Sequence, residues 1–319
     1  MSNTIIRPSS HEEWLKVRES GIGSSEVGTI LGLNPFETPY QLWRRKVGID
    51  APKEQNFAMR AGHYLEDAVS RFYQDETDKE IIKASAGDWI IRNNDRPYMQ
   101  VSPDRTFWIP GMPKNAQNKG ILECKTTQME VDADSVPQHW FAQLQYQLGV
   151  AELPQGALAW LTMGRKFGYR DFEFDPEFFG YITEEVTRFW QDNIVGKQEP
   201  LMMTVDDVLL RNPKHIVGKA VEADAELQES CRILKEVKEE LSALDTRKKE
   251  LEAAIKMAMG DAEALVAPPD GRGKPQILAT WKAAKDSLKF NESRFAQEQP
   301  DTYASYKETM PGSRRFLLK

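Results

Sequence analysis

Between residues 80 and 174 the chain consists of short segments rich in β-branched and aromatic residues, separated by Gly, Pro, Asn and Asp. Such segments favour β-strands. The expected strands cover residues 80–84, 88–92, 98–102, 106–109, 120–126, 156–163 and 169–174. We expect the first five to form a mostly antiparallel sheet, and the last two to form another strand pair.

Helical segments precede, interrupt and follow these strands. They cover residues 11–20, 24–31, 38–48, 57–75, 135–150 and 176–194. Ser24 or Ser25 is the expected N-cap of the second helix, and Thr38-Pro39 opens the third, which Gly48 closes. Helices on both sides of a mixed sheet predict an α/β fold class.

A change of character follows Thr204 and predicts two domains, residues 1–204 and 205–319. From Leu227 a heptad places mostly apolar residues at 227, 234, 241, 248 and 255, and at 237, 244, 251 and 258. This pattern predicts a long helix that lays an apolar seam on another helix, within the chain or in another copy. Segments 264–267 and 276–281 flank Pro268-Pro269-Asp270-Gly271 and predict a hairpin.

Composition narrows the class of protein. The formal net charge is −7, which has the wrong sign for holding nucleic acid by bulk electrostatics alone. Residues 271–319 carry ten Lys and Arg against five Asp and Glu, so this C-terminal segment is basic although the whole chain is acidic. Two cysteines are too few for a disulfide framework or a Cys₄ zinc site. No membrane span or signal peptide is apparent, so we expect a cytoplasmic protein without a membrane partner.

The residues with the clearest chemistry are Asp104, Glu123 and Lys125. Glu123 and Lys125 are alternate residues of an expected strand and therefore point to one face, whereas Cys124 faces the core. Asp104 ends Ser102-Pro103-Asp104, and a hairpin could return the chain so that Asp104 lies beside Glu123. Two carboxylates suit Mg²⁺, and a nearby ammonium can orient water or stabilise transition-state charge. This pattern is that of a PD-(D/E)xK nuclease.

Glu-x-Lys also arises by chance, as at Glu236-Val237-Lys238, and the bland alternative is a surface ion pair on an exposed strand. The histidines show no metal-ligand spacing. Nucleophile-elbow, phosphate-loop and dinucleotide-loop motifs are absent from the sequence, so other hydrolase, ATPase and dinucleotide-binding functions lack support.

The order of motifs over residues 10–195 resembles the YqaJ-type viral recombinase family, relatives of phage lambda exonuclease. The resemblance rests on Arg18 with Gly21-Ile22-Gly23-Ser24-Ser25, Ile30-Leu31-Gly32-Leu33-Asn34-Pro35-Phe36, Gly62-His63-Tyr64-Leu65-Glu66, Ser102-Pro103-Asp104, Leu122-Glu123-Cys124-Lys125 and Gln143-Leu144-Gln145-Tyr146. Arg105 departs from the pattern, because many members have glycine after the aspartate. The resemblance implies a restriction-endonuclease-like core, which the long helix and hairpin extend at the C-terminus.

The resemblance also implies roles for individual residues. Asp104, Glu123, the Cys124 backbone carbonyl and Glu66 would hold Mg²⁺, with Mn²⁺ as a substitute, and Lys125 would position the nucleophile. Gln143 would lie against the metal site. Arg18, Ser25 and Ser102 would form a pocket for a 5′-phosphate, since a guanidinium and a hydroxyl suit a phosphate dianion. The bland alternatives are an ion pair for Arg18 or Glu66, a helix cap for Ser25 and a solvent-facing amide for Gln143.

The implied function is a 5′→3′ exonuclease on linear double-stranded DNA, resecting ends for a single-strand annealing protein during phage-type recombination in a bacterial host cell. Homo-oligomers of the family could close a ring around DNA, for example as a trimer. One rival function is a structure-specific or nicking endonuclease with the same chemistry, which would not need Arg18 or Ser25. Another is a non-catalytic DNA-binding or scaffold protein, against which the intact Asp104, Glu123 and Lys125 argue.

Overall fold

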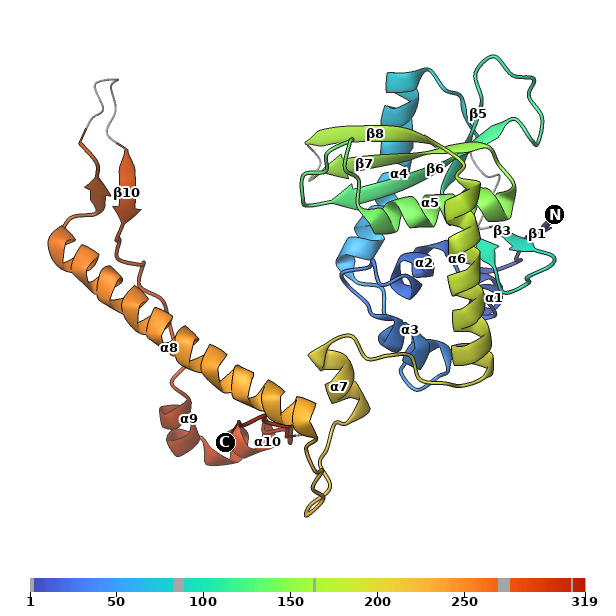
Figure 1. Cartoon of the computed structure of the whole chain (residues 1–319). Helices are drawn as coiled ribbons and strands as arrows, with labels where there is room; N and C mark the ends of the chain where they lie inside the picture. The colour runs from blue at the N-terminus through green and yellow to red at the C-terminus, as the bar shows by residue number, and fades with distance from the viewer. Residues whose placement is uncertain (1–2, 83–88, 163–164, 269–275, 311, 319) are drawn as a thin grey trace. The chain divides into compact units, whose positions relative to one another are not determined.

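The computed structural model describes residues 3–82, 89–162, 165–268, 276–310 and 312–318, and divides after Arg211 into two compact units (Figure 1). In the first unit the helices are α1 (His11–Glu19), α2 (Ser24–Ile30), α3 (Pro39–Lys46), α4 (Phe57–Thr77), α5 (Gln138–Ala151), α6 (Pro176–Arg188), the π-helix η1 (Phe189–Val195) and α7 (Val205–Arg211). Its strands are β1 (Asn3–Ile6), β2 (Ile81–Ile82), β3 (Ile90–Asn93), β4 (Gln100–Val101), β5 (Arg105–Trp108), β6 (Lys119–Thr127), β7 (Gln155–Thr162) and β8 (Lys166–Glu173).

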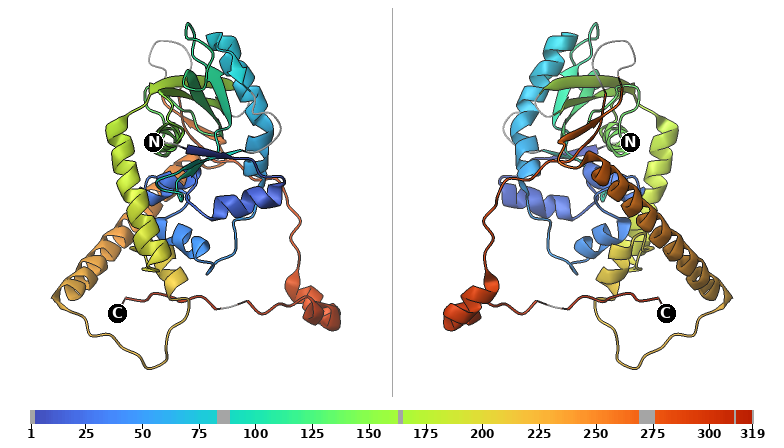
Figure 2. Two further views of the ribbon diagram at one scale, coloured as in Figure 1. Left: turned by 90° about the vertical axis from the view of Figure 1, so that its right-hand side faces the viewer. Right: turned by 90° about the vertical axis from the view of Figure 1, so that its left-hand side faces the viewer.

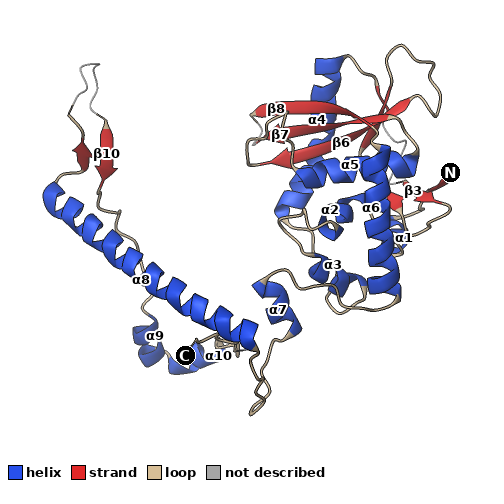
Figure 3. Ribbon diagram, in the orientation of Figure 1, coloured by secondary structure: helices blue, strands red, loops and turns tan. Residues whose placement is uncertain are grey.

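A five-stranded sheet in the order β2-β5-β6-β7-β8 forms the centre of the first unit. Its strands pair antiparallel except β6 and β7, which are parallel because α5 crosses between them. Helix α4 packs against one face of the sheet and α5 against the other (Figure 3). The expected α/β class, a mostly antiparallel central sheet flanked by helices, is therefore confirmed.

Two of the expected strands do not join this sheet. The segments predicted at 88–92 and 98–102 form β3 and β4, which pair with each other and with β1 in a separate three-stranded sheet. The prediction of one sheet was wrong because β1, at the start of the chain, was not recognised as a partner. Ile5 pairs with Ile91 and Ile91 with Val101 in this sheet. Residues 83–84, 88 and 163 of the predicted strands lie outside the described residues.

Apolar side chains cover both faces of the central sheet. Leu122 and Cys124 of β6 pack with Val69 and Tyr73 of α4. Their neighbours along β6 point the other way, where the core of Ile121, Leu144, Leu148, Leu158 and Trp160 includes residues of α5. The period of two along β6 therefore assigns alternate residues to opposite faces, as the sequence predicted.

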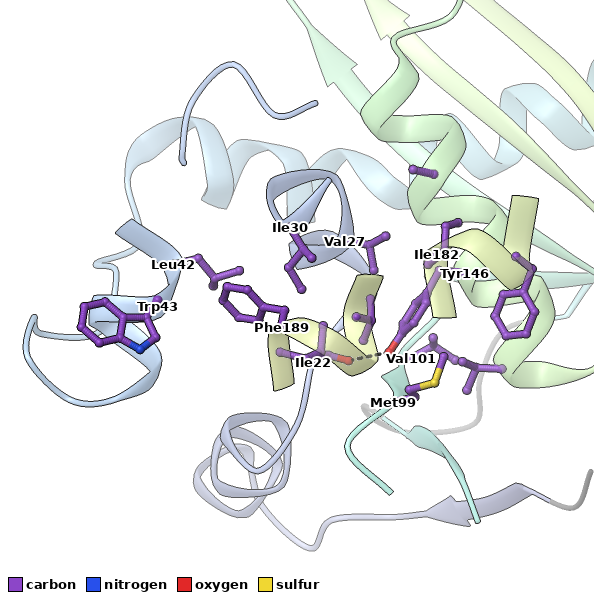
Figure 4. Close-up of a cluster of buried hydrophobic side chains, with 14 of the residues drawn as sticks. Ile22, Val27, Ile30, Leu42, Trp43, Met99, Val101, Tyr146, Ile182 and Phe189 are labelled. Carbon is purple, nitrogen blue, oxygen red and sulfur yellow. Dashed lines mark hydrogen bonds between the residues drawn. The ribbon is translucent and has the colours of Figure 1, made fainter. Parts of the chain in front are cut away.

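A third hydrophobic core joins α2, α3, α5, α6 and η1. Figure 2 shows the arrangement of these helices, and Figure 4 shows some of the side chains in this core. At its centre the buried Tyr146 hydroxyl donates a 3.0 Å hydrogen bond to the Ile22 carbonyl. This contact ties α5 to the loop before α2. The helix expected over residues 176–194 is present, and at Phe189 it changes from α6 to the π-helix η1. Phe189 lies buried at this change.

The helix starts follow local capping chemistry, with one correction. Thr38 caps α3 by accepting a 3.2 Å hydrogen bond from the Gln41 N–H, as predicted. The expected Ser24 or Ser25 cap of α2 was wrong. Gly23 is the N-cap, and its N–H donates to the Glu26 carboxylate at 2.9 Å, which leaves the serine hydroxyls free for other contacts.

Helix α7 belongs to the first unit, beyond the boundary expected at residue 204. Its Asp207 is fully buried and accepts a 2.8 Å hydrogen bond from the Thr38 hydroxyl. The second unit contains α8 (Ala225–Met259), the antiparallel strands β9 (Ala264–Val266) and β10 (Ile277–Thr280), α9 (Glu292–Glu298) and α10 (Pro300–Ser305). The long helix and hairpin are thus confirmed, although residues 269–271 of the expected turn lie outside the described residues. No helix in the described part of the chain is long and apolar enough to cross a bilayer.

Candidate active site

The pairing of β5 with β6 brings Asp104 to Glu123. Arg105 pairs with Leu122, so the same register places Asp104, one residue before β5, opposite Glu123. The Cys124 N–H donates a 2.8 Å hydrogen bond to Asp104 Oδ2. The hairpin return predicted from the sequence is therefore present. The Cys124 thiol points into the α4 side of the core, where burial raises its pKa well above the usual range.

Glu123, Lys125 and Gln143 form one hydrogen-bonded group on the α5 face of the sheet. Lys125 Nζ donates to Glu123 Oε1 at 2.7 Å and to Gln143 Oε1 at 2.8 Å. The Gln143 amide donates to the same Glu123 oxygen at 2.5 Å. Glu123 is 3% exposed and Gln143 8% exposed. The solvent-facing alternative for Gln143 is excluded, and the surface ion pair expected from chance does not describe Glu123.

Gln147 is a further member of this group that the sequence analysis missed. Its amide donates to Glu123 Oε2 at 2.8 Å and to the Ser24 hydroxyl at 3.2 Å, and the residue is fully buried. It thereby connects the buried carboxylate to the first residue of α2. The signal was available, since residues four apart on a helix share a face and Gln147 follows Gln143 by four.

Glu66 and Arg105 border the site from α4 and β5. Glu66 lies 3.3 Å from His63 Nδ1 and 3.7 Å from the Arg105 guanidinium. Arg105 also binds Asp67 at 2.7 Å, so the residue that departs from the family pattern pairs with acidic groups of α4. Glu66 is thus in an ion pair, the structural role given above as the alternative to metal binding. It also lies near enough to Glu123 for that carboxylate to raise the pKa of Glu66.

Crowding of acidic groups shifts the pKa values in the site. Burial raises the pKa of the Asp104 carboxyl well above its usual range, and Glu123 and Glu66 raise it further. Burial also raises the pKa of Glu66, against the opposing effect of His63 and Arg105. For Lys125, burial lowers the pKa, but the Glu123 and Asp104 carboxylates outweigh burial and raise it above the ordinary value. The two carboxylates thus favour the ammonium form of Lys125.

The donor set fits a hard divalent cation in its chemistry. Carboxylate oxygens are the ligands Mg²⁺ prefers, and a cation would offset the acidic crowding around Asp104. Among the described residues, however, no three His, Cys, Asp or Glu side chains converge closely enough to hold a metal ion as they stand. Glu123 accepts three of the described hydrogen bonds, two on Oε1 and one on Oε2, so the second lone pair of Oε2 is its site for a cation in this arrangement.

The candidate phosphate pocket contains two of its three expected members in contact. Arg18 Nη2 donates a 2.8 Å hydrogen bond to the Ser25 hydroxyl, and the guanidinium lies 5.0 Å from the centre of the Trp14 ring. Among the described residues, the hydrogen-bond partner of Arg18 is a hydroxyl and not a carboxylate. Ser102 instead donates to the Trp89 carbonyl at 2.9 Å, so its hydrogen bond does not join it to the other two.

Comparison with known proteins agrees with this arrangement of motifs. The family described as "YqaJ-like viral recombinase domain" matches residues 13–154. Uncharacterized protein YqaJ of Bacillus subtilis (strain 168) is 30% identical over 321 residues, which cover 97% of this chain and 94% of that protein. Uncharacterized protein R354 of Acanthamoeba polyphaga mimivirus is 22% identical over 160 residues, 45% of this chain and 27% of that protein.

Two solved structures show a distant likeness. An alkaline exonuclease, LHK-Exo, from Laribacter hongkongensis has 16% identity and a TM-score of 0.45, covering 58% of this chain and 93% of that one. A putative exonuclease from Eubacterium rectale has 12% identity and a TM-score of 0.40, covering 68% and 97%. The assignment of the chain to a family rests on the full-length similarity to YqaJ together with the domain match. The protein belongs to the YqaJ-like viral recombinase family.

Proposed function

We propose that this protein is a Mg²⁺-dependent deoxyribonuclease that degrades linear double-stranded DNA from its 5′ ends. The observation that carries the proposal is the buried group in which Lys125 and Gln143 share one oxygen of Glu123, with Asp104 held opposite by the Cys124 N–H. Residues that formed only a surface ion pair would remain exposed to solvent. Carboxylates beside a fixed ammonium suit hydrolysis of a phosphodiester.

Each residue has a definite task in this proposal. Asp104, Glu123, the Cys124 carbonyl and Glu66 would hold Mg²⁺, for which Mn²⁺ would substitute, and the bound cation would activate water and polarise the scissile phosphate. The Lys125 ammonium orients the attacking water and stabilises negative charge that develops on phosphate oxygens. Gln143 keeps the Lys125 ammonium directed toward Glu123 through its 2.8 Å contact.

Arg18 and Ser25 supply the preference for a DNA end. Water attacks phosphorus, the bond from phosphorus to the 3′ oxygen breaks, and that oxygen leaves with a proton. Each cut therefore releases one nucleotide and leaves a 5′-phosphate on the next. A guanidinium already in contact with a hydroxyl can grip that terminal dianion with charge-assisted hydrogen bonds.

Digestion of three substrates tests the proposal. Linear duplex with a 5′-phosphate should be degraded faster than duplex with a 5′-hydroxyl, and a covalently closed circle should survive. Mg²⁺ should support cleavage, Ca²⁺ should support binding without efficient turnover, and EDTA should stop the reaction. Full activity in EDTA would exclude the metal, and rapid cutting of the circle would favour an endonuclease.

Arg18→Ala separates the end pocket from the cleavage chemistry. Loss of the guanidinium should bring the rate on 5′-phosphorylated ends down toward the rate on 5′-hydroxyl ends. Lys16→Ala is the matched control, since it removes a cation from the same helix whose present partner is Glu12. Equal slowing on both kinds of end by Arg18→Ala would contradict the pocket.

A further inference from the structure

The long helix α8 of the second unit carries large apolar side chains that are exposed along one face. Over its 35 residues, Val237 is 42% exposed, Leu241 60%, Leu244 66% and Leu251 50%. Within the described part of the second unit, no other helix or strand packs extensively along α8. One local contact, Phe316 at 5.8 Å from Lys238 Nζ, lies beside the helix. Exposed apolar side chains that recur along one face of a helix mark an interaction surface.

We propose that α8 pairs antiparallel with α8 of a second copy of this chain. The surface concerned is the α8 seam, defined by Leu227, Ser230, Leu234, Val237, Leu241, Leu244, Lys248, Leu251, Ile255 and Ala258. Spacings of three and four residues keep these positions on one side of the helix, as in a coiled coil.

The antiparallel register matches the seam to itself. With the two-fold axis midway between residues 242 and 243, Leu241 faces Leu244 of the second copy. In the same register Leu234 faces Leu251, and Leu227 faces Ala258. Each of these layers occurs twice because a two-fold pair is self-complementary. Lys248 then faces Val237, so the one charged seam residue never meets its own copy.

The charges that flank the seam agree with this orientation. In the antiparallel pair, Glu240 lies beside Arg247 of the second copy on one side of the seam, and Lys238 beside Asp245 on the other. Both contacts join opposite charges and both occur twice. Within the chain, Arg247 pairs with Glu250 at 3.6 Å and Asp245 with Lys249 at 2.6 Å, both on the same exposed helix. Such surface pairs exchange at little cost.

A parallel pair fits the same helix poorly. It would place Lys248 against Lys248 within the apolar seam, and Glu240 beside Asp245 at the flank. Both contacts join like charges, the first in a partly dehydrated position where repulsion is stronger. Flanking charges set partner and orientation more than affinity. The charge pattern therefore selects an antiparallel second copy as the occupant of the seam.

Sedimentation equilibrium of the full chain tests the pairing. Wild type should associate further than Leu241→Asp, because aspartate at the centre of the seam removes two apolar layers. The matched control is Ala243→Asp, at an exposed position on the outer side of α8, which should behave as wild type. The comparison holds even where the first unit also self-associates. Identical association of wild type and Leu241→Asp overturns the proposal and leaves another protein as the occupant.

Charge reversal decides the orientation. Glu240→Arg should weaken the association roughly 10-fold, because each pair then contains two Arg–Arg contacts. Adding Arg247→Glu should restore it. In a parallel pair, Glu240→Arg would instead remove repulsion from Asp245 and tighten the association. Tightening by Glu240→Arg, or no rescue by the double variant, overturns the antiparallel arrangement.

Discussion

In most proteins polar side chains are exposed and apolar side chains are buried, and each unit of this protein departs from that pattern in a different way. Near the candidate active site the polar residues are buried, with Glu123 3% exposed and Gln147 fully covered. On α8 the large apolar residues are exposed, with Leu244 at 66%. Burying polar groups and exposing apolar groups both cost free energy, so each pattern indicates a function.

The partners of these residues differ as well. Glu123 on β6 is satisfied by Gln143 and Gln147 of α5, some twenty residues away in sequence, and Gln147 in turn contacts Ser24 of α2. Side-chain contacts along α8 are instead mostly between residues three or four apart on the same helix, such as Asp245 with Lys249. A substitution in the first unit should therefore affect distant groups, while a substitution on α8 should have local effects within one chain.

The largest expected effect is the loss of the ammonium from the buried site. Lys125→Ala should slow DNA cleavage by roughly 100- to 1,000-fold, because a preorganised donor to transition-state charge is removed. Single-turnover digestion of linear duplex measures the effect. Lys119→Ala takes an ammonium from the start of the same strand and should retain activity. Near-normal cleavage by Lys125→Ala, with an unchanged melting curve for both variants, would refute the assigned role.

Truncation in the core of the first unit should destabilise strongly. Leu144 is fully buried between α5 and the sheet, so Leu144→Ala should lower the free energy of unfolding by about 2–5 kcal/mol. Chemical denaturation followed by tryptophan fluorescence measures the loss. Leu144→Met, which conserves volume, should cost less than about 1.5 kcal/mol. A negligible cost of the alanine variant would mean that this face of α5 does not form part of the core.

A smaller effect is expected for the residue that joins the buried carboxylate to α2. Gln147→Leu should slow cleavage roughly 10-fold, because Glu123 Oε2 loses its donor and its orientation becomes less defined. The rate at saturating DNA should fall more than the affinity for DNA ends. Gln138→Leu, at the exposed start of α5, is the control. Wild-type turnover by Gln147→Leu would show that the contact contributes only to packing.

The smallest effect is expected on α8. In protein dilute enough to be monomeric, Leu251→Ala should change the free energy of unfolding by no more than about 0.5 kcal/mol. The reason is that the Leu251 side chain is half exposed on the surface of α8. The same denaturation assay compares it with Leu144→Ala. A loss of several kcal/mol at Leu251 would mean that the seam is already covered within one chain, and the contrast between the units would disappear.

Local sequence patterns determined much of this protein. The alternation along β6 assigned Glu123 and Lys125 to one face and Cys124 to the other, and the structure confirms both faces. Capping residues identified the start of α3, and the heptad identified the long α8. These features depend on residues within a few positions of one another, where backbone geometry sets which side chains share a face. Family motifs then singled out Arg18 and Ser25, whose side chains are hydrogen-bonded in the structure.

Contacts between distant segments were decided only by the tertiary structure. Strand β1 joins β3 in a separate sheet, which no local pattern signals. Gln147 contacts Ser24, 123 residues away in sequence, and Arg105 binds Asp67 of α4. Strand partners and buried polar contacts depend on which surfaces meet when helices and sheets pack. The same short sequence can therefore form either a surface ion pair or a buried hydrogen-bonded group, and the packing decides between them.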